Sequence, residues 1–363
     1  MSDDFAPNGA PLKRGWTTGA CATAATKAAL GALLGHGFPS LVSITLPGGQ
    51  MPGFALAHEL EGSGFAEAGI IKDAGDDPDV THGALVMARV ERGAQGSGVT
   101  FHAGEGVGIV TKPGLPLAVG EPAINPVPRQ MMTGVVAELA GAAGIAADFR
   151  ITIAVRDGAE LAKKTWNPRL GIVGGLSILG TTGIVIPYSC SAWIHSIHRG
   201  IDVARAMGLT HVVGSTGDLS EKAAMARLGL PIEAYLDMGD FVGGVLKYLK
   251  SHPVERVTIT GGFGKLAKLA NGAMDLHSGR SSVDVQSLVK ILQNLGASDY
   301  IAARAAELET ANAVLQLAEA GGLGLAGVVA QQARDAAQRV VGDATRVDVL
   351  IIDRAGAIVG ESD

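Results

Sequence analysis

Residues 166–183 read WNPRLGIVGGLSILGTTG, and this stretch separates two parts of the chain that have different sequence patterns. Between residues 170 and 198 there is no Asp, Glu, Lys or Arg, although glycine recurs through the run. The glycines and Pro187 argue against a membrane-spanning helix. Because glycine permits close approach to the backbone, we expect either a ligand or a neighbouring strand beside this run.

The part that follows this stretch alternates between strand and helix patterns. Short apolar runs at 211–213, 257–260 and 347–353 are separated by helical segments. This alternation predicts a doubly wound, parallel-type sheet flanked by helices. Glycine-rich loops at 214–217 and 261–264 follow the first two runs, and such loops bind ligands at the carboxyl ends of parallel strands.

The part that precedes the stretch has short strand patterns separated by turn residues, which favours a mixed or antiparallel sheet with helices. We expect a helix of small residues from about Ala20, and an extended proline-rich segment that ends at Arg129. The fold class is therefore α/β (α+β overall). We expect an N-terminal α+β domain over 1–157 and a C-terminal Rossmann-like α/β domain over 158–363.

Composition narrows the possible partners and location. The chain has 363 residues, a hydrophobic content of 47% and a net charge of −6. Neither half is basic, so nucleic acid is not an expected partner. The two cysteines, Cys21 and Cys190, have no metal-binding spacing, and the first residues show no secretory signal. We expect a cytoplasmic protein with no membrane segment and no thiolate metal site; a homo-oligomer is compatible with the sequence.

Two regions of the first part carry polar groups suited to chemistry. Thr17 and Thr18 follow Lys13 and Arg14 at the start of the small-residue helix, where they either cap the helix or form an anion site. The loop at 72–83 holds four Asp residues and His82. It is either a solvated turn, an oxygen-ligand cation loop, or a source of acid and base groups such as Asp73 and His82.

Several familiar motifs are absent. The turn at 261–265 lacks the first glycine and the final Ser or Thr of a phosphate-binding P-loop. No dinucleotide fingerprint and no Gly-x-Ser-x-Gly nucleophile elbow occurs in the chain. Nicotinamide chemistry and serine hydrolysis are therefore unsupported.

Taken together, the sequence blocks resemble one family over roughly residues 12–355. They are KRGWTTGACATAA at 13–25, DAGDDPD at 73–79, GEGVG at 104–108, NPVPR at 125–129, WNPRLGI at 166–172, GGLSILGTTG at 174–183, GSTG at 214–217 and GGFGK at 261–265. Their order resembles the CbiD family, the cobalt-precorrin-5B C1-methyltransferases of corrinoid biosynthesis.

This resemblance implies S-adenosylmethionine-dependent methylation of ring carbon C1 of a tetrapyrrole, giving cobalt-precorrin-6A, with cobalt present only as part of the substrate. A base is optional in such a transfer, and we predict Asp73, His82 or Glu105 for that role. Because the substrate carries many carboxylates, we predict the following contacts to it: Arg14, Thr17, Thr18, Arg129, Asn167, Arg169 and Arg280.

The glycine-rich loops provide the predicted contacts to the methyl donor. They are Gly174, Gly175, Gly180, Thr181, Thr182, Gly214, Ser215, Thr216, Gly261, Gly262 and Gly264. Two other function classes remain open: a non-catalytic tetrapyrrole-binding carrier, and a nucleotide- or phosphate-utilising α/β enzyme that uses the loops at 214–217 and 261–265.

Overall fold

The computed structural model describes residues 11–362, which divide into two compact units between Ser189 and Cys190. The division lies 32 residues beyond the predicted boundary at 157/158 (189 − 157), so residues 158–189 pack with the first unit. The reason is strand pairing. The segment contributes β10 (Ile172–Val173) and β11 (Ile184–Val185), which pair with β8 (Ile109–Val110) and β1 (Gly15–Trp16) of the same unit.

The first unit is built on a five-stranded sheet in the order β4-β5-β6-β9-β7. All neighbouring pairs are antiparallel except β7 and β9, which are parallel. This confirms the mixed sheet predicted for the first part. The strands are β4 (His58–Gly62), β5 (Phe65–Ile71), β6 (Leu85–Arg92), β7 (Val99–Ala103) and β9 (Phe149–Val155). A separate hairpin joins β2 (Leu41–Ser43) to β3 (Gly53–Ala55).

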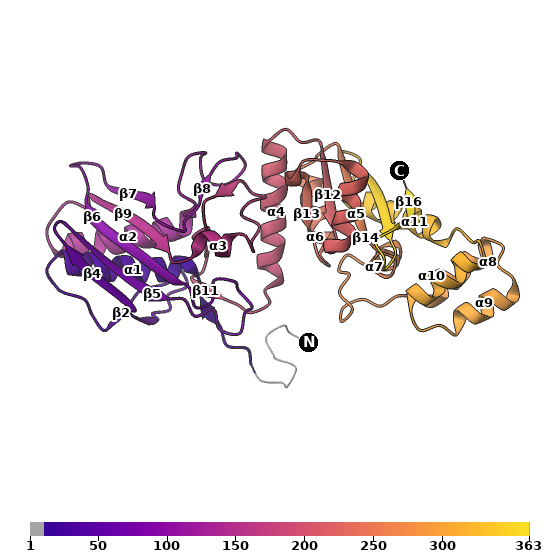
Figure 1. The fold of residues 1–363 in the computed structure, drawn as a ribbon, viewed down its shortest axis with the longest axis horizontal. Coiled ribbons are helices and arrows are strands. Elements are labelled where there is room, and N and C mark those ends of the chain that lie inside the picture. Colours follow the sequence, from indigo (N-terminus) through magenta and orange to yellow (C-terminus); the bar gives the residue numbers. More distant parts are fainter. Residues whose placement is uncertain (1–10, 363) are drawn as a thin grey trace. The chain divides into compact units, whose positions relative to one another are not determined.

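Helix α1 (Thr18–Leu33) packs against β5, β6 and helix α2 (Pro126–Ala142) (Figure 1). It begins where the Thr17 side chain accepts a hydrogen bond from the Ala20 amide. Its alanines, Ala24 and Ala28 among them, are almost fully buried, because small side chains let the helix lie close to the sheet. The predicted small-residue helix is therefore confirmed.

Helix α2 corrects one expectation. Residues 125–129 were predicted to be extended, but Asn125 is the N-cap residue, and Pro126 lies at the first helical position. Proline is favoured there, because its missing N–H would have no helical partner and its fixed φ suits the helix. The short helix α3 (Gly158–Ala162) follows β9.

The second unit contains a five-stranded sheet in the order β13-β12-β14-β15-β16, in which only β16 runs antiparallel to its neighbour. Residues 257–260 of β14 are all buried, as expected of a strand covered by helices on both faces. The doubly wound sheet is thus confirmed. Its strands are β12 (His211–Ser215), β13 (Tyr235–Asp237), β14 (Arg256–Gly262), β15 (Arg346–Ile352) and β16 (Ile358–Ser362).

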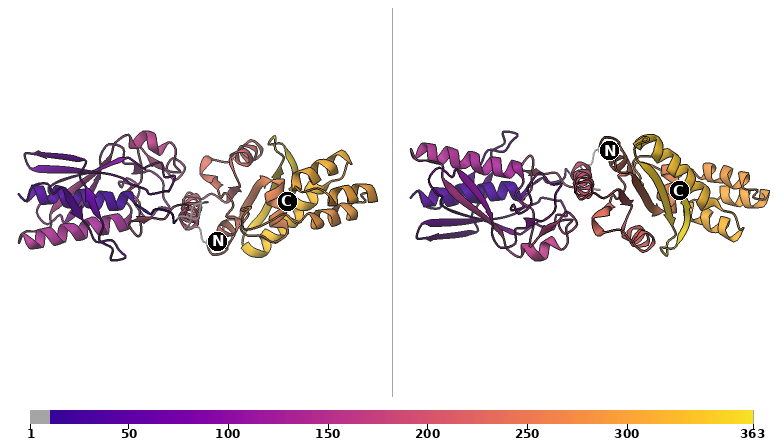
Figure 2. Two further views of the ribbon diagram at one scale, coloured as in Figure 1. Left: turned by 90° about the horizontal axis from the view of Figure 1, so that it is seen from below. Right: turned by 90° about the horizontal axis from the view of Figure 1, so that it is seen from above.

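The helices of this unit connect the strands. They are α4 (Cys190–Ala206), α5 (Asp218–Leu228), the 3₁₀ turn η1 (Ile232–Ala234), α6 (Val242–Ser251), α7 (Phe263–Ala270), α8 (Val285–Asn294), α9 (Asp299–Ala306), α10 (Ala311–Ala320) and α11 (Leu325–Val341). All except α8, α9 and α10 pack near the sheet. Helices α8, α9 and α10 form a group beyond α7 and α11 (Figure 2). Within residues 11–362, no helix has the length and apolar character needed to cross a bilayer.

Candidate functional site

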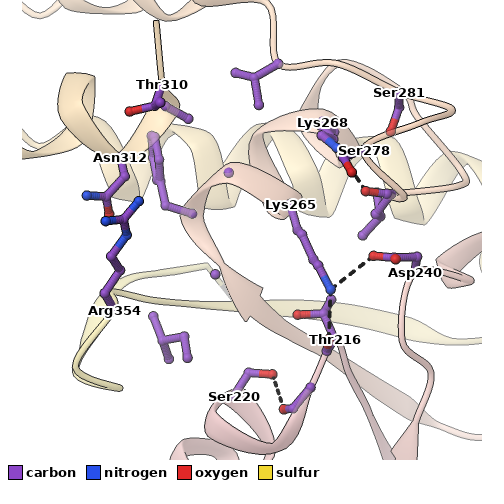
Figure 3. Close-up of a pocket in the computed structure, with 18 of the residues that line it drawn as sticks. Thr216, Ser220, Asp240, Lys265, Lys268, Ser278, Ser281, Thr310, Asn312 and Arg354 are labelled. Atoms are coloured by element: carbon purple, nitrogen blue, oxygen red, sulfur yellow. Dashed lines mark hydrogen bonds and ion pairs between the residues drawn. The ribbon is translucent and has the colours of Figure 1, made fainter. Parts of the chain in front are cut away.

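The second unit has a cavity of about 1170 Å³ at the carboxyl ends of its parallel strands (Figure 3). Strand β12 leads through α5 to β13 on one side, whereas β14 leads through α7–α11 to β15 on the other. The chain therefore leaves β12 and β14 in opposite directions. In doubly wound sheets, ligands bind at this reversal of strand order.

Two helices begin at the cavity without a side-chain cap. Gly217 precedes α5 and Gly262 precedes α7, and neither end has a capping side chain. Both glycines line the cavity. The first backbone N–H groups of a helix have no partner within the helix, so these two helix ends can donate hydrogen bonds to a polar ligand.

Lys265 and Asp240 form an ion pair at the wall of the cavity, with 3.0 Å between Nζ and Oδ1. The Lys265 ammonium also donates to the carbonyl oxygen of Thr216 at 2.9 Å, which ties α7 to the loop after β12 (Figure 3). Asp240 follows β13, 23 residues after Gly217 (240 − 217). In nucleotide-binding α/β folds, an acidic residue about 20 residues after the glycine loop binds ribose hydroxyls.

The glycine loops of this unit are divided between wall and strand. Of the residues predicted to contact the methyl donor, Thr216, Gly262 and Gly264 line the cavity. In contrast, Gly214, Ser215 and Gly261 are buried within β12 and β14. A Cβ on Gly214 would lie 2.9 Å from the Met238 sulfur, and one on Gly261 would lie 2.6 Å from Thr216 Oγ1. These three residues shape the strands beneath the cavity.

The glycine-rich stretch at 166–183 belongs to the first unit, where all its glycines except Gly174 face backbone or side chains of that unit. A Cβ on Gly175 would lie 2.3 Å from the carbonyl carbon of Gly106, and one on Gly180 would lie 2.2 Å from Thr17 Oγ1. Gly174 has open space around it. This stretch therefore fits the strand-packing interpretation at Gly175 and Gly180, while Gly174, Thr181 and Thr182 remain exposed.

Three of the predicted substrate contacts hold the same stretch in place. The Thr18 hydroxyl accepts from the Leu179 amide at 2.9 Å. The Asn167 side chain is buried, donates to the Gly175 carbonyl and accepts from Ser177. Thr17 caps α1. Their side chains already have partners in the protein, so their clearest role is to order the backbone.

The predicted arginines have different surroundings. Arg129 donates to the carbonyls of Ile124 and Pro122 and pairs with Glu121 at 2.7 Å. These contacts stabilise the loop that precedes α2. Arg280 pairs with Asp275 in the second unit and does not line the cavity. The Arg14 side chain is exposed. The amide of Arg169 donates to the Trp166 carbonyl within the turn at 166–169.

Asp73 and His82, two of the predicted acid–base residues, lie close together in the loop after β5. His82 Nδ1 is 3.9 Å from Asp73 Oδ1. A hydrogen bond from Lys13 and another from the Gly75 amide lower the pKa of Asp73, which makes it a weaker base. His82 Nδ1 accepts a hydrogen bond from the Ala74 amide, so a neutral His82 carries its proton on Nε2.

Glu105, the third predicted acid–base residue, is exposed on the loop before β8. In the described part of the chain, its side chain has no hydrogen bond or ion pair with Asp73 or His82. The structure thus brings together two of the three predicted groups and leaves Glu105 separate from them.

Sequence reasoning missed several residues of the cavity. Asp240 could have been found from its spacing after the loop at 214–217. Residues 218–220 and 352–354 also line the cavity, and so do residues of segments 276–283 and 309–312, which carry no recognisable motif and flank α8 and α9. They include Ser278, Ser281, Thr310 and Asn312.

The strand order places the second unit in the class of doubly wound α/β units, joined here to a first unit with a mixed sheet. Comparison with known proteins identifies the family: the chain belongs to the CbiD family. The model of CbiD matches residues 6–187, and the model of the CbiD C-terminal domain matches residues 275–363. The first match ends close to the division between the two units, and the predicted resemblance is confirmed.

Similar proteins match over almost their full lengths. A protein of Rhodospirillum rubrum is 61% identical over 99% of both chains, and one of Paramagnetospirillum magneticum is 60% identical over 97% of this chain and 98% of its own. Both are named cobalt-precorrin-5B C(1)-methyltransferase. A crystal structure of the cobalamin biosynthesis protein cbiD from Archaeoglobus fulgidus is 27% identical, covers 74% of this chain and 83% of its own, and has a TM-score of 0.41.

Proposed function

We propose that this protein is a cobalt-precorrin-5B C(1)-methyltransferase that uses S-adenosylmethionine and forms cobalt-precorrin-6A in cobalamin biosynthesis. The observation that carries this proposal is the identity of 56–61% with proteins of that name over 94–99% of their lengths. The tetrapyrrole is the small-molecule substrate, and its cobalt is part of that substrate.

The cavity of the second unit is the proposed site of the methyl donor. Its donors and acceptors suit a nucleoside, because Asp240 can accept from ribose hydroxyls and the starts of α5 and α7 offer backbone N–H groups. When bound, S-adenosylmethionine supplies a methyl group on a sulfonium, whose sulfur keeps the bonding electron pair as the new carbon–carbon bond forms. The contribution of the protein is to orient the donor and exclude water.

The first unit supplies the proposed contacts to the macrocycle. The backbone of Arg14 forms a β-bridge with Gly75, which places Arg14 beside the Asp73 loop. Its side chain is exposed and can bind a carboxylate of the substrate. Arg169 is proposed for the same role. Of the proposed bases we favour Glu105, whose side chain is exposed. The low pKa of Asp73 and the occupied Nδ1 of His82 make these two groups better suited to binding.

The deciding experiment is an anaerobic assay with cobalt-precorrin-5B and S-adenosylmethionine that carries a deuterated methyl group. We expect one labelled methyl group on C1 of the product, located by NMR. A carrier would bind the macrocycle and leave the label on the donor. A nucleotide-utilising enzyme would be stabilised against heat by nucleotides and not by S-adenosylmethionine or S-adenosylhomocysteine.

A further inference from the structure

The two lysines of α7 that line the cavity differ in how their charge is balanced. Lys265 is paired with Asp240. Lys268 lies in the last turn of α7 and is only 7% exposed, and its ammonium donates to the Leu276 carbonyl at 2.9 Å. Within residues 11–362, no carboxylate lies within ion-pair distance of Lys268, although the residue lines the cavity.

A buried ammonium without a counter-charge is costly unless other groups satisfy it. An ammonium has three N–H donors, and the Leu276 carbonyl accepts one of them. The loop that contains Leu276 also brings Ser278 and Ser281 to the cavity wall (Figure 3). Ser281 donates its proton to the His277 carbonyl, whereas the Ser278 hydroxyl has no hydrogen bond within the described chain. The donors of Lys268 and Ser278 are therefore available to an anionic group.

We propose that Lys268 and Ser278 form a carboxylate-binding subsite, which takes the carboxylate of the amino-acid portion of the methyl donor. This inference rests on the proposed function, because it takes the cavity as the donor site. Asp240 and Lys268 then distinguish the two ends of the ligand. The Asp240 carboxylate accepts hydrogen bonds from the ribose hydroxyls, and the Lys268 ammonium binds the carboxylate of the amino-acid portion. The pair orients the donor within the cavity.

A carboxylate of the macrocycle could also bind to Lys268 and Ser278. Two adenosine ligands test whether the bound carboxylate belongs to the methyl donor or to the macrocycle. S-Adenosylhomocysteine carries the amino-acid carboxylate, whereas 5′-methylthioadenosine retains the nucleoside and lacks the amino-acid portion. In Lys268→Met, we expect calorimetry to show S-adenosylhomocysteine binding weakened about 10- to 100-fold, as for loss of a charge-assisted hydrogen bond, with 5′-methylthioadenosine binding unchanged.

Lys265→Met is the matched control, because it removes an ammonium from the same helix and the same cavity. Lys265 faces Asp240, so this change should alter the affinities for both ligands by the same factor. Ser278→Ala tests the subsite without removing a charge. It should weaken S-adenosylhomocysteine alone, by about threefold to tenfold.

Equal weakening of both ligands by Lys268→Met would overturn the inference, because Lys268 would then only anchor the loop through Leu276. If Lys268→Met weakened macrocycle binding and left S-adenosylhomocysteine binding intact, the subsite would serve the macrocycle and the assignment to the donor would be wrong. If Lys268→Met did not fold, the Ser278→Ala result would decide. A wild-type protein that binds neither adenosine ligand would contradict the proposed donor site itself.

Discussion

Glycine-rich loops occur in both units, but they serve different purposes in each. In the first unit, Gly175 lies against Gly106, so two backbone segments pack directly on each other. In the second unit, Gly262 has no heavy atom within 4 Å of where a Cβ would stand, and it lines a cavity. Similar sequence strings thus permit close packing in one unit and line a cavity in the other.

The largest expected effect on stability comes from a methyl group at the packed glycine. Gly175→Ala places Cβ 2.3 Å from backbone atoms of Gly106. Because backbone cannot move aside as a side chain can, we expect a loss of about 3 to 5 kcal/mol, measured as a lower denaturant midpoint. Gly174→Ala is the control: its φ of +89° makes alanine strained but its surroundings are open, so the cost should be about 1 to 2 kcal/mol. Equal effects would contradict the packing role.

The next largest effect concerns a buried charge in the first unit, which already has its partner in the chain. Lys72 is 1% exposed, and its ammonium contacts Asp79 Oδ2 at 2.5 Å. Asp79→Asn leaves that ammonium facing a neutral amide, so we expect the free energy of unfolding to fall by about 3 kcal/mol. The double variant Lys72→Met/Asp79→Asn should recover part of the loss in the same denaturation experiment. No recovery would show that Asp79 acts through Thr81 instead.

The same ion pair predicts how acid affects the first unit. Burial raises the pKa of Asp79, but the charge and hydrogen bond of Lys72 and the hydrogen bonds from Thr81 outweigh it, so the pKa in the folded chain is lowered. The contribution of Asp79 is then fully present above the unfolded pKa of about 3.9 and is lost as pH falls through the lower folded value. Denaturant midpoints taken at successively lower pH should fall more for the wild type than for Asp79→Asn. Parallel curves would contradict this linkage.

The smallest effect on stability is expected at the cavity. At Gly262 φ is −66° and a Cβ would have open space, but alanine is a poorer N-cap residue than glycine, so Gly262→Ala should lower the free energy of unfolding by about 0.5 to 1 kcal/mol. The added methyl group stands at the cavity wall, where a ligand must approach the start of α7. We therefore expect S-adenosylhomocysteine to bind about tenfold more weakly by calorimetry. Unchanged binding of S-adenosylhomocysteine would contradict the idea that glycines of the second unit, unlike those of the first, leave room for a ligand.

Local patterns were sufficient to predict much of the fold. The buried run at 257–260 and the small-residue helix from Ala20 were both predicted, because burial on two faces and close helix packing restrict residue types locally. At residues 125–129 two local rules conflict, because proline favours extended chain and is also favoured at the first position of a helix. The extended chain was predicted, but Pro126 begins α2. Strand β16 was not predicted, since its pairing with β15 is a tertiary feature.

The site was harder to predict than the fold, because its members come from distant segments. A glycine loop was predicted at 261–264 from its position after a strand, but residues 261–262 end β14 and residues 263–264 begin α7. The partner of Gly175, however, is Gly106, which lies 69 positions earlier (175 − 106), so the sequence could not show whether this glycine meets a ligand or its own chain. Lys268 is held to the loop that carries Ser278 by its hydrogen bond to the Leu276 carbonyl, and a backbone acceptor leaves no trace in the residue types.

The pairing of β1 with β11 also has a consequence for the connectivity of the first unit. Gly15 pairs with Val185, which lies 170 positions later (185 − 15), so the segments that enter and leave the unit are neighbours. Closing a loop of that length costs about 4 to 5 kcal/mol of chain entropy. Because these segments are adjacent, a short linker can join them and new ends can be opened at the exposed turn near Gly96. We therefore expect the first unit to tolerate circular permutation with the strand order of its sheet unchanged.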